Sequence, residues 1–373
     1  MSKSERESGR SSSDGAYTLA EILSQPLSWS TSLKSLEASG QLREIAQKFR
    51  GAEEWLFLGC GSSYYVAQAA ASTMAELTGK RARALPASEP LLFPEMTFAG
   101  SRNWVPVLIS RSGQTSEVLK AAEALKQRGV TTVGISCAPG QTLEKLVDTA
   151  IVLPAADEQS TVMTRSFSTM LLALQALAAT VAGRAEFVQA LEQLTPAAEK
   201  LVSSLPSRVR DFVGNHSFED YVCLGQGPLY GIACELALKL TEMSVSYGQA
   251  FHTLEFRHGP KSIVSPNTLI TFLLSESGYG AEVEVLEEIK KLGGTTLAVA
   301  NQADARAKAA ADFLVEIGAD GSEYARLAPY LITGQLMGLY TGLKKGQDPD
   351  RPRNLSRVVI LEEESASPEH ASL

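Results

Sequence analysis

Cysteine and histidine are scarce in this chain. Its 373 residues include four of each, and the cysteines stand far apart with no Cys-x-x-Cys pair; they are Cys60, Cys137, Cys223 and Cys234. A disulfide framework or a zinc site needs denser and more closely spaced ligands. The sequence therefore predicts no metal site, and four free thiols favour a reducing compartment, which we expect to be the cytoplasm.

Excess positive charge and long apolar runs are also missing. The chain has 34 basic and 42 acidic residues, a net charge of -8, which argues against a broad electrostatic grip on nucleic acid or on an anionic membrane. Its most apolar stretch, 170–182, is shorter than the roughly 20 residues of a membrane span and is expected to be a buried helix. Because the net charge is negative, any anionic ligand must be bound by a few groups within one site.

Two parts of the chain repeat one pattern. Residues 54–61, EWLFLGCG, match 220–227, DYVCLGQG, at an offset of 166, and SRSG at 110–113 matches SESG at 275–278 at an offset of 165. Each half alternates strands, turns and helices, as in a parallel sheet flanked by helices. We therefore predict an α/β fold of two tandem, doubly wound, flavodoxin-like subdomains, 37–195 and 208–361, related by internal repeat.

The remaining segments are expected to be accessory. Residues 1–16 and 362–373 are polar and are predicted to be mobile tails, 17–36 form a helical extension, and the link over 195–210 is expected to be helical. Ligands of doubly wound sheets bind outside the carboxyl ends of the strands. This rule confines candidate sites to the turns after Leu58, Ile109, Leu224 and Leu274.

The turn after Ile109 is rich in hydroxyls. Ser110, Ser112 and Thr115, free backbone amides and the positive end of a helix dipole together form a potential phosphate site. Helix capping is the alternative, because Ser or Thr commonly precedes an amphipathic helix. The second copy of the turn carries Glu276 where the first carries Arg111. A carboxylate there would repel phosphate, which favours an anion site in the first half alone.

A glycine turn lies beside the hydroxyl turn in this topology. Residues 59–63, GCGSS, add two further hydroxyls and a close approach of the backbone. The turn is not a dinucleotide fingerprint, because the third glycine is missing and no acidic residue ends a following strand. We therefore expect no nicotinamide, and no other cofactor.

A narrow charged stripe marks one helix of the second half. Glu235, Lys239 and Glu242 stand at i, i+4 and i+7, and apolar residues occupy most of the remaining circumference. A solvated ion-pair face is the ordinary alternative, but the stripe is too thin for a surface helix and is expected to line a cleft. Two carboxylates around one ammonium can acquire separate pKa values, which suits one of them to act as a general base. His258 follows in a turn bounded by Gly259 and Pro260.

Taken together, these motifs resemble the sugar isomerase (SIS) family. The paired halves, the Ser-x-Ser-Gly-x-Thr turn, and the Glu-x3-Lys-x2-Glu helix followed by Arg-His-Gly-Pro carry the resemblance, which covers nearly the whole chain. Residues 18–29 are most similar to stand-alone amino-sugar-6-phosphate deaminase/isomerases, the branch also described as tagatose-6-phosphate ketose/aldose isomerases. Residues 352–357, PRNLSR, are similar to the isomerase part of glucosamine-6-phosphate synthases.

The resemblance implies roles for individual residues. Glu242 would move a proton between C1 and C2 of the sugar through an enediol or enolamine, supported by Glu235 and Lys239. His258 would open the sugar ring, from across a dimer interface. Arg357 stands where the synthases carry a catalytic lysine, although a guanidinium shuttles protons poorly. The residues implied to bind the substrate and its phosphate are Cys60, Gly61, Ser62, Ser63, Ser110, Arg111 through its backbone, Ser112, Thr115 and Ser356.

The expected function is therefore that of a phosphosugar enzyme. A glutaminase segment with a nucleophilic cysteine does not precede residue 37, which disfavours synthesis with ammonia from glutamine and favours deamination of an amino-sugar phosphate or simple isomerisation. The alternatives are a phosphosugar sensor without catalysis and a fructosamine-6-phosphate deglycase. The expected partners are a phosphorylated amino sugar and a second copy of the chain, in a homodimer or a dimer of dimers, with neither nucleic acid nor membrane involved.

Overall fold

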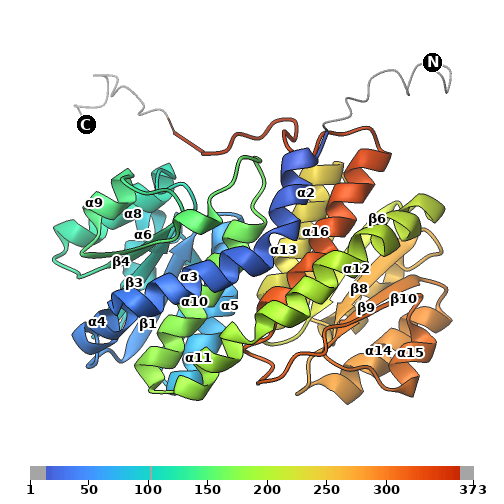
Figure 1. Cartoon of the computed structure of the whole chain (residues 1–373), viewed down its shortest axis with the longest axis horizontal. Helices are drawn as coiled ribbons and strands as arrows, with labels where there is room; N and C mark the ends of the chain where they lie inside the picture. The colour runs from blue at the N-terminus through green and yellow to red at the C-terminus, as the bar shows by residue number, and fades with distance from the viewer. Residues whose placement is uncertain (1–13, 101–102, 362–373) are drawn as a thin grey trace, which may run out of the picture.

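Two five-stranded parallel sheets form the frame of the computed structural model, which describes residues 14–100 and 103–361 (Figure 1). The strand orders are β2-β1-β3-β4-β5 and β10-β9-β8-β6-β7, so each half has the flavodoxin-like order 2-1-3-4-5. This confirms the predicted fold class. The strands are β1 Glu54–Gly59, β2 Arg81–Pro86, β3 Trp104–Ile109, β4 Val133–Ser136, β5 Thr149–Val152, β6 Asp220–Gly225, β7 Gly248–Phe251, β8 Thr268–Leu273, β9 Thr295–Ala300 and β10 Phe313–Glu316.

The inner strands owe their position to unbroken apolar runs. Every residue of β1 and β8 is buried, as expected for a strand whose two faces are both covered by helices. The edge strand β2 is only partly buried, because it is hydrogen-bonded on one side alone. Parallel pairing of β1 with β3 brings the turns after Gly59 and Ile109 to the same edge of the first sheet.

Helices cover both faces of each sheet. In the first half they are α5 Ser62–Thr78, α6 Glu89–Leu92, α7 Pro94–Phe98, α8 Ser116–Gln127, α9 Thr142–Leu146 and α10 Arg165–Ala182, with the 3-10 turn η1 Pro154–Ala156. In the second half they are α13 Leu229–Ser244, α14 Tyr279–Lys291, α15 Ala305–Ala310 and α16 Leu327–Lys344, with η2 Glu255–Arg257 and η3 Pro260–Ile263.

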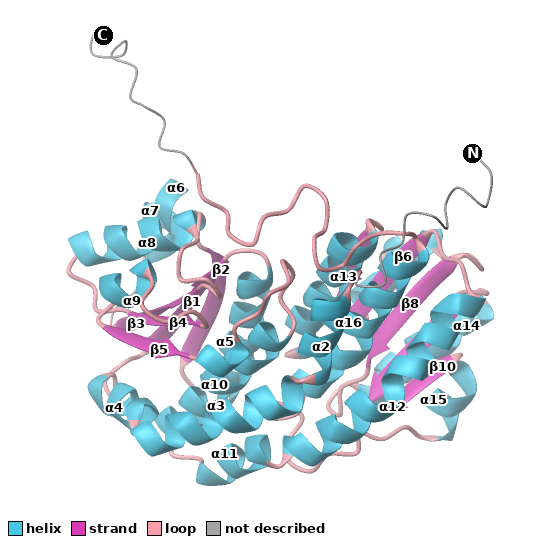
Figure 2. Cartoon of the chain, turned by 45° about the horizontal axis from the view of Figure 1, so that its top comes forward, coloured by secondary structure: helices cyan, strands magenta, loops and turns pink. Residues whose placement is uncertain are grey.

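Four helices join the two sheets at the centre of the molecule. Helices α5 and α10 of the first half and α13 and α16 of the second lie between the sheets (Figures 1 and 2). Close packing of α16 on α13 depends on glycine. A Cβ atom on Gly338 would lie 2.9 Å from the carbonyl oxygen of Lys239 and 2.9 Å from Cε of Met243. The small residue therefore lets the backbone that carries Lys239 pack tightly.

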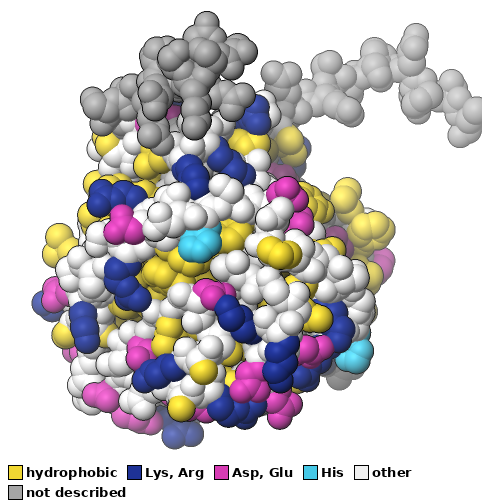
Figure 3. Space-filling view, turned by 90° about the vertical axis from the view of Figure 1, so that its right-hand side faces the viewer, with side chains coloured by type: hydrophobic (Ala, Val, Ile, Leu, Met, Phe, Trp, Pro, Cys, Tyr) yellow, Lys and Arg dark blue, Asp and Glu magenta, His cyan; other side chains and the backbone are white. Residues whose placement is uncertain are grey.

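Helix α10 is a core helix. It is long and apolar enough to cross a membrane by length and composition, but 78% of it is buried inside the protein, which confirms the buried helix predicted over 170–182. Burial in this bundle accounts for its apolar character all round. The surface carries basic side chains interspersed with acidic ones on the face shown in Figure 3, so this face shows no broad field of one sign.

The remaining helices precede the first half or link the two halves. Helices α2 Ala16–Leu23, α3 Gln25–Ser39 and α4 Gln41–Lys48 come before the first sheet. Helices α11 Ala185–Glu192 and α12 Leu194–Asn215 link the halves. After α16, the C-terminal segment, 345–361, runs from the second half across to the first (Figure 2). The predicted tails fall almost wholly on 1–13 and 362–373, outside the described residues.

Candidate active site

A cavity of about 180 Å³ lies at the carboxyl ends of β1 and β3, the position predicted from the sequence. The two predicted turns, helix α13, the loop between β5 and α10, and the C-terminal segment surround it. Its lining includes Cys60, Gly61, Ser62, Ser63, Arg111, Ser112, Thr115, Thr161, Met163, Glu242, Ser356, Arg357, Val358 and Val359. The fold therefore brings most of the predicted site residues together.

The glycine turn places the start of α5 directly at the end of β1. A Cβ atom on Gly59 would lie 2.5 Å from the carbonyl carbon and oxygen of Ser63, so only glycine allows this approach. Gly61 has φ +54°, in the region that favours glycine. The turn thereby directs Ser62 and Ser63 toward the cavity, and both are buried.

The hydroxyl turn is held in shape by its own side chains. Ser110 Oγ lies 2.9 Å from Thr115 Oγ1 and accepts a hydrogen bond from the Gly113 amide at 3.1 Å. Thr115 stands at the N-cap of α8, but its side chain makes no capping hydrogen bond. The capping alternative therefore does not account for Thr115. Ser110 is buried behind the turn, which it supports, and does not line the cavity.

The guanidinium of Arg111 does not face a ligand. It is buried, its Nη1 donates to the Val162 carbonyl at 3.1 Å and lies 3.4 Å from Glu158 Oε2, and its Nη2 donates to the Arg357 carbonyl at 2.8 Å. The sequence suggested that this guanidinium attracts phosphate, but both of its terminal nitrogens are engaged by groups of the chain itself. The Arg111 backbone amide remains in the turn.

The corresponding turn of the second half binds a carboxylate of the chain itself. The amides of Glu276 and Ser277 donate to Glu323 Oε2 at 2.8 and 3.2 Å, and the Ser277 hydroxyl donates to Glu323 Oε1. The Glu276 side chain, expected to repel anions, turns away and pairs with the buried Arg326. Both turns thus have anion-binding geometry, and the second is already filled.

Thr161 occupies the position of Glu323 in the first half. Each residue lies four positions before the helix that follows, since α10 begins at Arg165 and α16 at Leu327. Thr161 is shorter and uncharged, and it lines the cavity. No described residue accepts a hydrogen bond from the Arg111 or Ser112 amide. The first turn is therefore open where the second is closed.

The charged stripe on α13 is buried at the opposite wall of the cavity. Lys239 Nζ lies 3.3 Å from Glu235 Oε1 and donates to Glu242 Oε2, and Lys239 and Glu235 are fully buried. Ser62 joins the halves here, since it donates to Glu235 at 3.2 Å and accepts from Lys239 at 3.2 Å. Only Glu242 of the three lines the cavity, and 18% of its side chain is exposed.

Burial separates the roles of the two carboxyl groups. Burial raises the pKa of Glu235 to about 8, against the opposing effect of Lys239. Burial lowers the pKa of Lys239, but the two carboxylates reverse this effect and raise it above its usual value. Burial thus disfavours the charged form of Glu235, which leaves Glu242, the carboxylate that faces the cavity, as the main partner of the Lys239 charge.

The remaining predicted residues are more exposed. Ser356 donates to the Val358 carbonyl at 2.7 Å, and Arg357 pairs with Asp157 at 2.5 Å, so both reach the cavity from the C-terminal segment. His258 is exposed, follows η2 and does not line the cavity within one chain. In the described part of the chain, no three His, Cys, Asp or Glu residues are placed to hold a metal ion.

Sequence reasoning missed Thr161 and Met163. Both belong to the loop after β5, and Ser63 Oγ lies 3.9 Å from the Met163 sulfur. The signal was available, because this loop also follows the carboxyl end of a strand of the first sheet. It was overlooked because β5 is a short edge strand of four residues with a weak apolar pattern.

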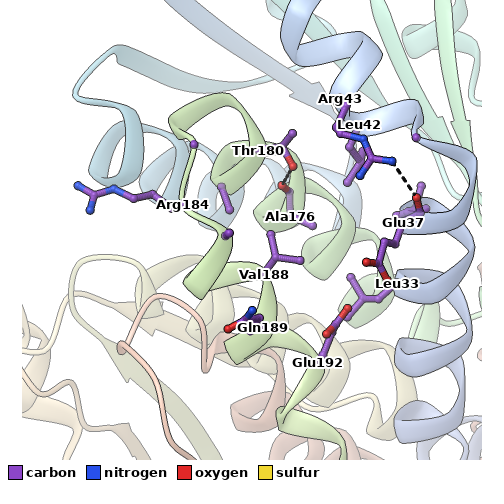
Figure 4. Close-up of a pocket in the computed structure, with 15 residues that line it drawn as sticks. Leu33, Glu37, Leu42, Arg43, Ala176, Thr180, Arg184, Val188, Gln189 and Glu192 are labelled. Carbon is purple, nitrogen blue, oxygen red and sulfur yellow. Dashed lines mark hydrogen bonds between the residues drawn. The ribbon is translucent and has the colours of Figure 1, made fainter.

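A larger cavity of about 520 Å³ lies elsewhere, among α3, α4, α10 and α11. Figure 4 shows that it is walled by apolar side chains such as Leu33, Leu42 and Val188, with Glu37, Arg43 and Glu192 also lining it. It contains no cluster that pairs a phosphate-binding turn with a base. We therefore assign the chemistry to the smaller cavity.

Comparison with known proteins agrees with the fold. The SIS domain family model matches residues 48–180 and 220–337, one match in each half. The chain is similar to a glutamine–fructose-6-phosphate aminotransferase (isomerizing) from Pyrobaculum aerophilum, with 26% identity over 93% of this chain and 58% of that protein. It thus spans little more than half the length of such relatives.

Two solved structures have nearly the same extent as this chain. The glucosamine-6-phosphate deaminase from Thermotoga maritima is 29% identical, with a TM-score of 0.76 over 92% of this chain and 100% of that one. The tagatose-6-phosphate ketose/aldose isomerase from Escherichia coli is 23% identical, with a TM-score of 0.81 over 96% and 99%, which supports the fold. With a family match in both halves and one sheet in each, the chain belongs to the SIS domain family.

Proposed function

We propose that the protein is a phosphosugar aldose–ketose isomerase that deaminates an amino-sugar 6-phosphate of the glucosamine or galactosamine type. One observation carries the proposal: a single cavity holds an open anion-binding turn on one wall and a carboxylate paired with a buried ammonium on the other. An enzyme that isomerises a phosphosugar needs both features, the turn to hold the phosphate and the carboxylate to move a proton.

The second half supports the phosphate assignment. Its turn binds the Glu323 carboxylate through two amides and one hydroxyl. The first turn offers the same three groups on Arg111 and Ser112, and the shorter Thr161 stands where the internal anion would be. An oxyanion from outside the chain is therefore the natural occupant, and backbone amides at the start of α8 favour phosphate.

Glu242 is the proposed base. It takes the proton from C2 of the open-chain aldose and returns one to C1, through an enediol or enolamine, while Lys239 holds it in place. For an amino sugar the product is a 2-imino compound. Addition of water and loss of ammonia then leave the ketose phosphate, so the net reaction consumes one water and releases one ammonia.

Ring opening is assigned to His258 from a second copy of the chain. Within one chain this exposed side chain lies outside the cavity, so the proposed homodimer, alone or paired as a dimer of dimers, would complete the site. Arg357 is better suited to hold the C-terminal segment through Asp157 than to transfer protons.

The similarity to a deaminase supports this reaction. The Thermotoga maritima structure is matched along its whole length at 29% identity. We propose a cytoplasmic enzyme, given four free cysteines. Simple isomerisation, a fructosamine-6-phosphate deglycase and a non-catalytic sensor are the alternatives.

The test is to incubate the protein with glucosamine-6-phosphate, galactosamine-6-phosphate and fructose-6-phosphate in deuterated water. Ammonia and ketose are assayed, and proton NMR follows exchange at C2 of the amino sugars and at C1 of fructose-6-phosphate, whose C2 carries no hydrogen. We expect exchange and ammonia release with one amino sugar. Phosphosugar binding without exchange in any of the three would favour the sensor and overturn the enzyme.

A second test replaces the proposed base. Glu242→Gln preserves size and removes the carboxylate, and we expect turnover to fall by a factor of roughly 1,000 with substrate affinity changed little. Undiminished C2 exchange in this variant would exclude Glu242 as the base.

A further inference from the structure

Helix α2 contacts both segments that cover the candidate active site. One cover is the loop 157–163, which contributes Thr161 and Met163 to the cavity, and the other is the C-terminal segment, which contributes Ser356 to Val359. The helix has eight residues and does not itself reach the cavity. Its two contacts involve different side chains and can be tested separately.

Glu21 of α2 holds the loop. Its carboxylate is 3% exposed and accepts hydrogen bonds from the amides of Gln159 at 2.5 Å and Ser160 at 3.2 Å, and from the Ser160 hydroxyl. Burial, and then the charge of Glu158, raise the pKa of Glu21 above its usual value. A neutral amide of the same shape is therefore expected to replace this carboxyl group well.

Asp350 joins α2 to the second cover. Its carboxylate accepts hydrogen bonds from the amides of Tyr17 at 3.1 Å and Thr18 at 2.7 Å, and from the Thr18 hydroxyl at 2.7 Å. The backbone carbonyl of Asp350 accepts from the Thr161 amide at 3.0 Å. The C-terminal segment, α2 and the loop thus form one hydrogen-bonded unit.

The loop transmits this support to the phosphate turn. Glu158 and the Val162 carbonyl engage the guanidinium of Arg111, whose backbone belongs to the turn. Asp157 pairs with Arg357 of the C-terminal segment. The contacts to Arg111 run through buried polar groups, so displacement of the loop leaves unpaired donors behind and displaces the cavity wall.

We propose that α2 supports both the loop 157–163 and the C-terminal segment. Glu21 of α2 positions the loop, and Asp350 positions the C-terminal segment on α2. The proposal rests on the proposed function for its catalytic readout. Glu21 acts on the wall that binds the phosphate, whereas the base Glu242 lies on α13 of the other half. Loss of Glu21 should therefore weaken substrate binding and leave the chemical step intact.

The first experiment compares Glu21→Ala, Glu21→Gln and Leu33→Ala in steady-state kinetics with the amino-sugar phosphate that the protein turns over. We expect KM to rise by roughly tenfold or more in Glu21→Ala, with kcat within about threefold of the wild type. Glu21→Gln should restore KM to within about threefold. Leu33→Ala, which alters the apolar cavity of Figure 4, should destabilise the fold without raising KM.

The second experiment asks whether the two covers share a support. Asp350→Ala and the double variant Glu21→Ala/Asp350→Ala are measured in the same assay. If α2 is common to both covers, the double variant raises KM by clearly less than the product of the single effects. A simple product of the two effects, or a fall in kcat with KM unchanged, overturns the proposal.

A third measurement works without any substrate. In hydrogen–deuterium exchange of the apo protein, Glu21→Ala should speed amide exchange in peptides over 157–163 by at least about tenfold, with β1 and α10 unchanged. Unchanged exchange in this loop overturns the proposal. If the wild type neither binds nor converts any phosphosugar, the proposed function fails, and exchange alone decides the role of Glu21.

Discussion

One loop side chain fills the anion site of the second turn, and its counterpart leaves the first turn open. Glu323 reaches the amides of its turn, whereas Thr161, four residues before the corresponding helix, is too short and carries no charge. Thr161→Glu should therefore place a carboxylate in the phosphate site. Repulsion of several kcal/mol between like charges predicts a loss of phosphosugar affinity of at least about 100-fold, measured by isothermal titration calorimetry.

The control for this variant is Thr161→Gln, which has the same size without the charge. A neutral amide competes poorly with a phosphate dianion, and we expect an affinity loss below about tenfold. Equal losses in the two variants would mean that bulk, and not an internal anion, closes the site.

Glu282 should make stability depend on pH. Its side chain is buried, it accepts from the amide and hydroxyl of Ser275, and burial raises its pKa from 4.5 to about 7. Because the folded state holds the proton more tightly, the contribution of Glu282 to the free energy of unfolding is complete below pH 4.5. This contribution, about 3 kcal/mol, is lost as pH rises to 7. Urea denaturation should show that the free energy of unfolding falls less between pH 5 and pH 8 in Glu282→Gln than in the wild type. An equal fall in the variant and the wild type would exclude Glu282 as the origin of the pH dependence.

Prediction from sequence worked best for residues whose spacing reveals their environment. Glu235, Lys239 and Glu242 form a stripe that is too narrow for a surface, and the structure buries it at the cavity. Thr161 had no such pattern. The fate of the Arg111 side chain also could not be predicted, because its partners come from loops distant in sequence.

At the scale of whole elements, the packing of α13 against α16 positions Glu242, the proposed base. Gly338 faces Lys239 and Met243 at distances that leave no space for a Cβ atom. Gly338→Val should separate the helices and lower the free energy of unfolding by about 1–3 kcal/mol, measured by urea denaturation. Gly214→Val is the matched control, because a Cβ there meets nothing within 4 Å. Similar losses in both variants would point to helix propensity instead of packing.

The inner strands could be predicted because they are buried on both faces and therefore apolar throughout. The edge strands β2 and β7 could not. Residues 81–86 carry arginine at positions 81 and 83 and are only partly buried. Residues 248–251 form a strand of four half-buried residues. Pairing with the neighbouring strand, and not local pattern, gives them their structure.

At the scale of the whole molecule, the proposed dimer implies that two chains share each site. Glu242→Gln and His258→Ala should each be nearly inactive alone. When the two are unfolded, mixed in equal amounts and refolded, half of the dimers are mixed, and each mixed dimer has one intact site of two. Activity of about a quarter of the wild-type value is expected in the ammonia assay. No recovery, despite mixed dimers detected by mass spectrometry, would place His258 in the site of its own chain or outside the reaction.

Global organisation was predictable where the chain repeats and unpredictable where the ends return. The offsets between the halves indicated two similar sheets, and both sheets have the same strand order. The return of the C-terminal segment to the first half, and its junction with α2 through Asp350, join residues more than 300 positions apart. Such contacts have no local signature, because they depend on the packed positions of both ends.

The Glu323 carboxylate has a consequence for which half can respond to a ligand. A ligand attached to its own receptor by the chain is present at a very high effective concentration and never diffuses away. The turn of the second half is thus occupied whatever the concentration of metabolites. On the proposed function, only the turn of the first half is left for the substrate to fill.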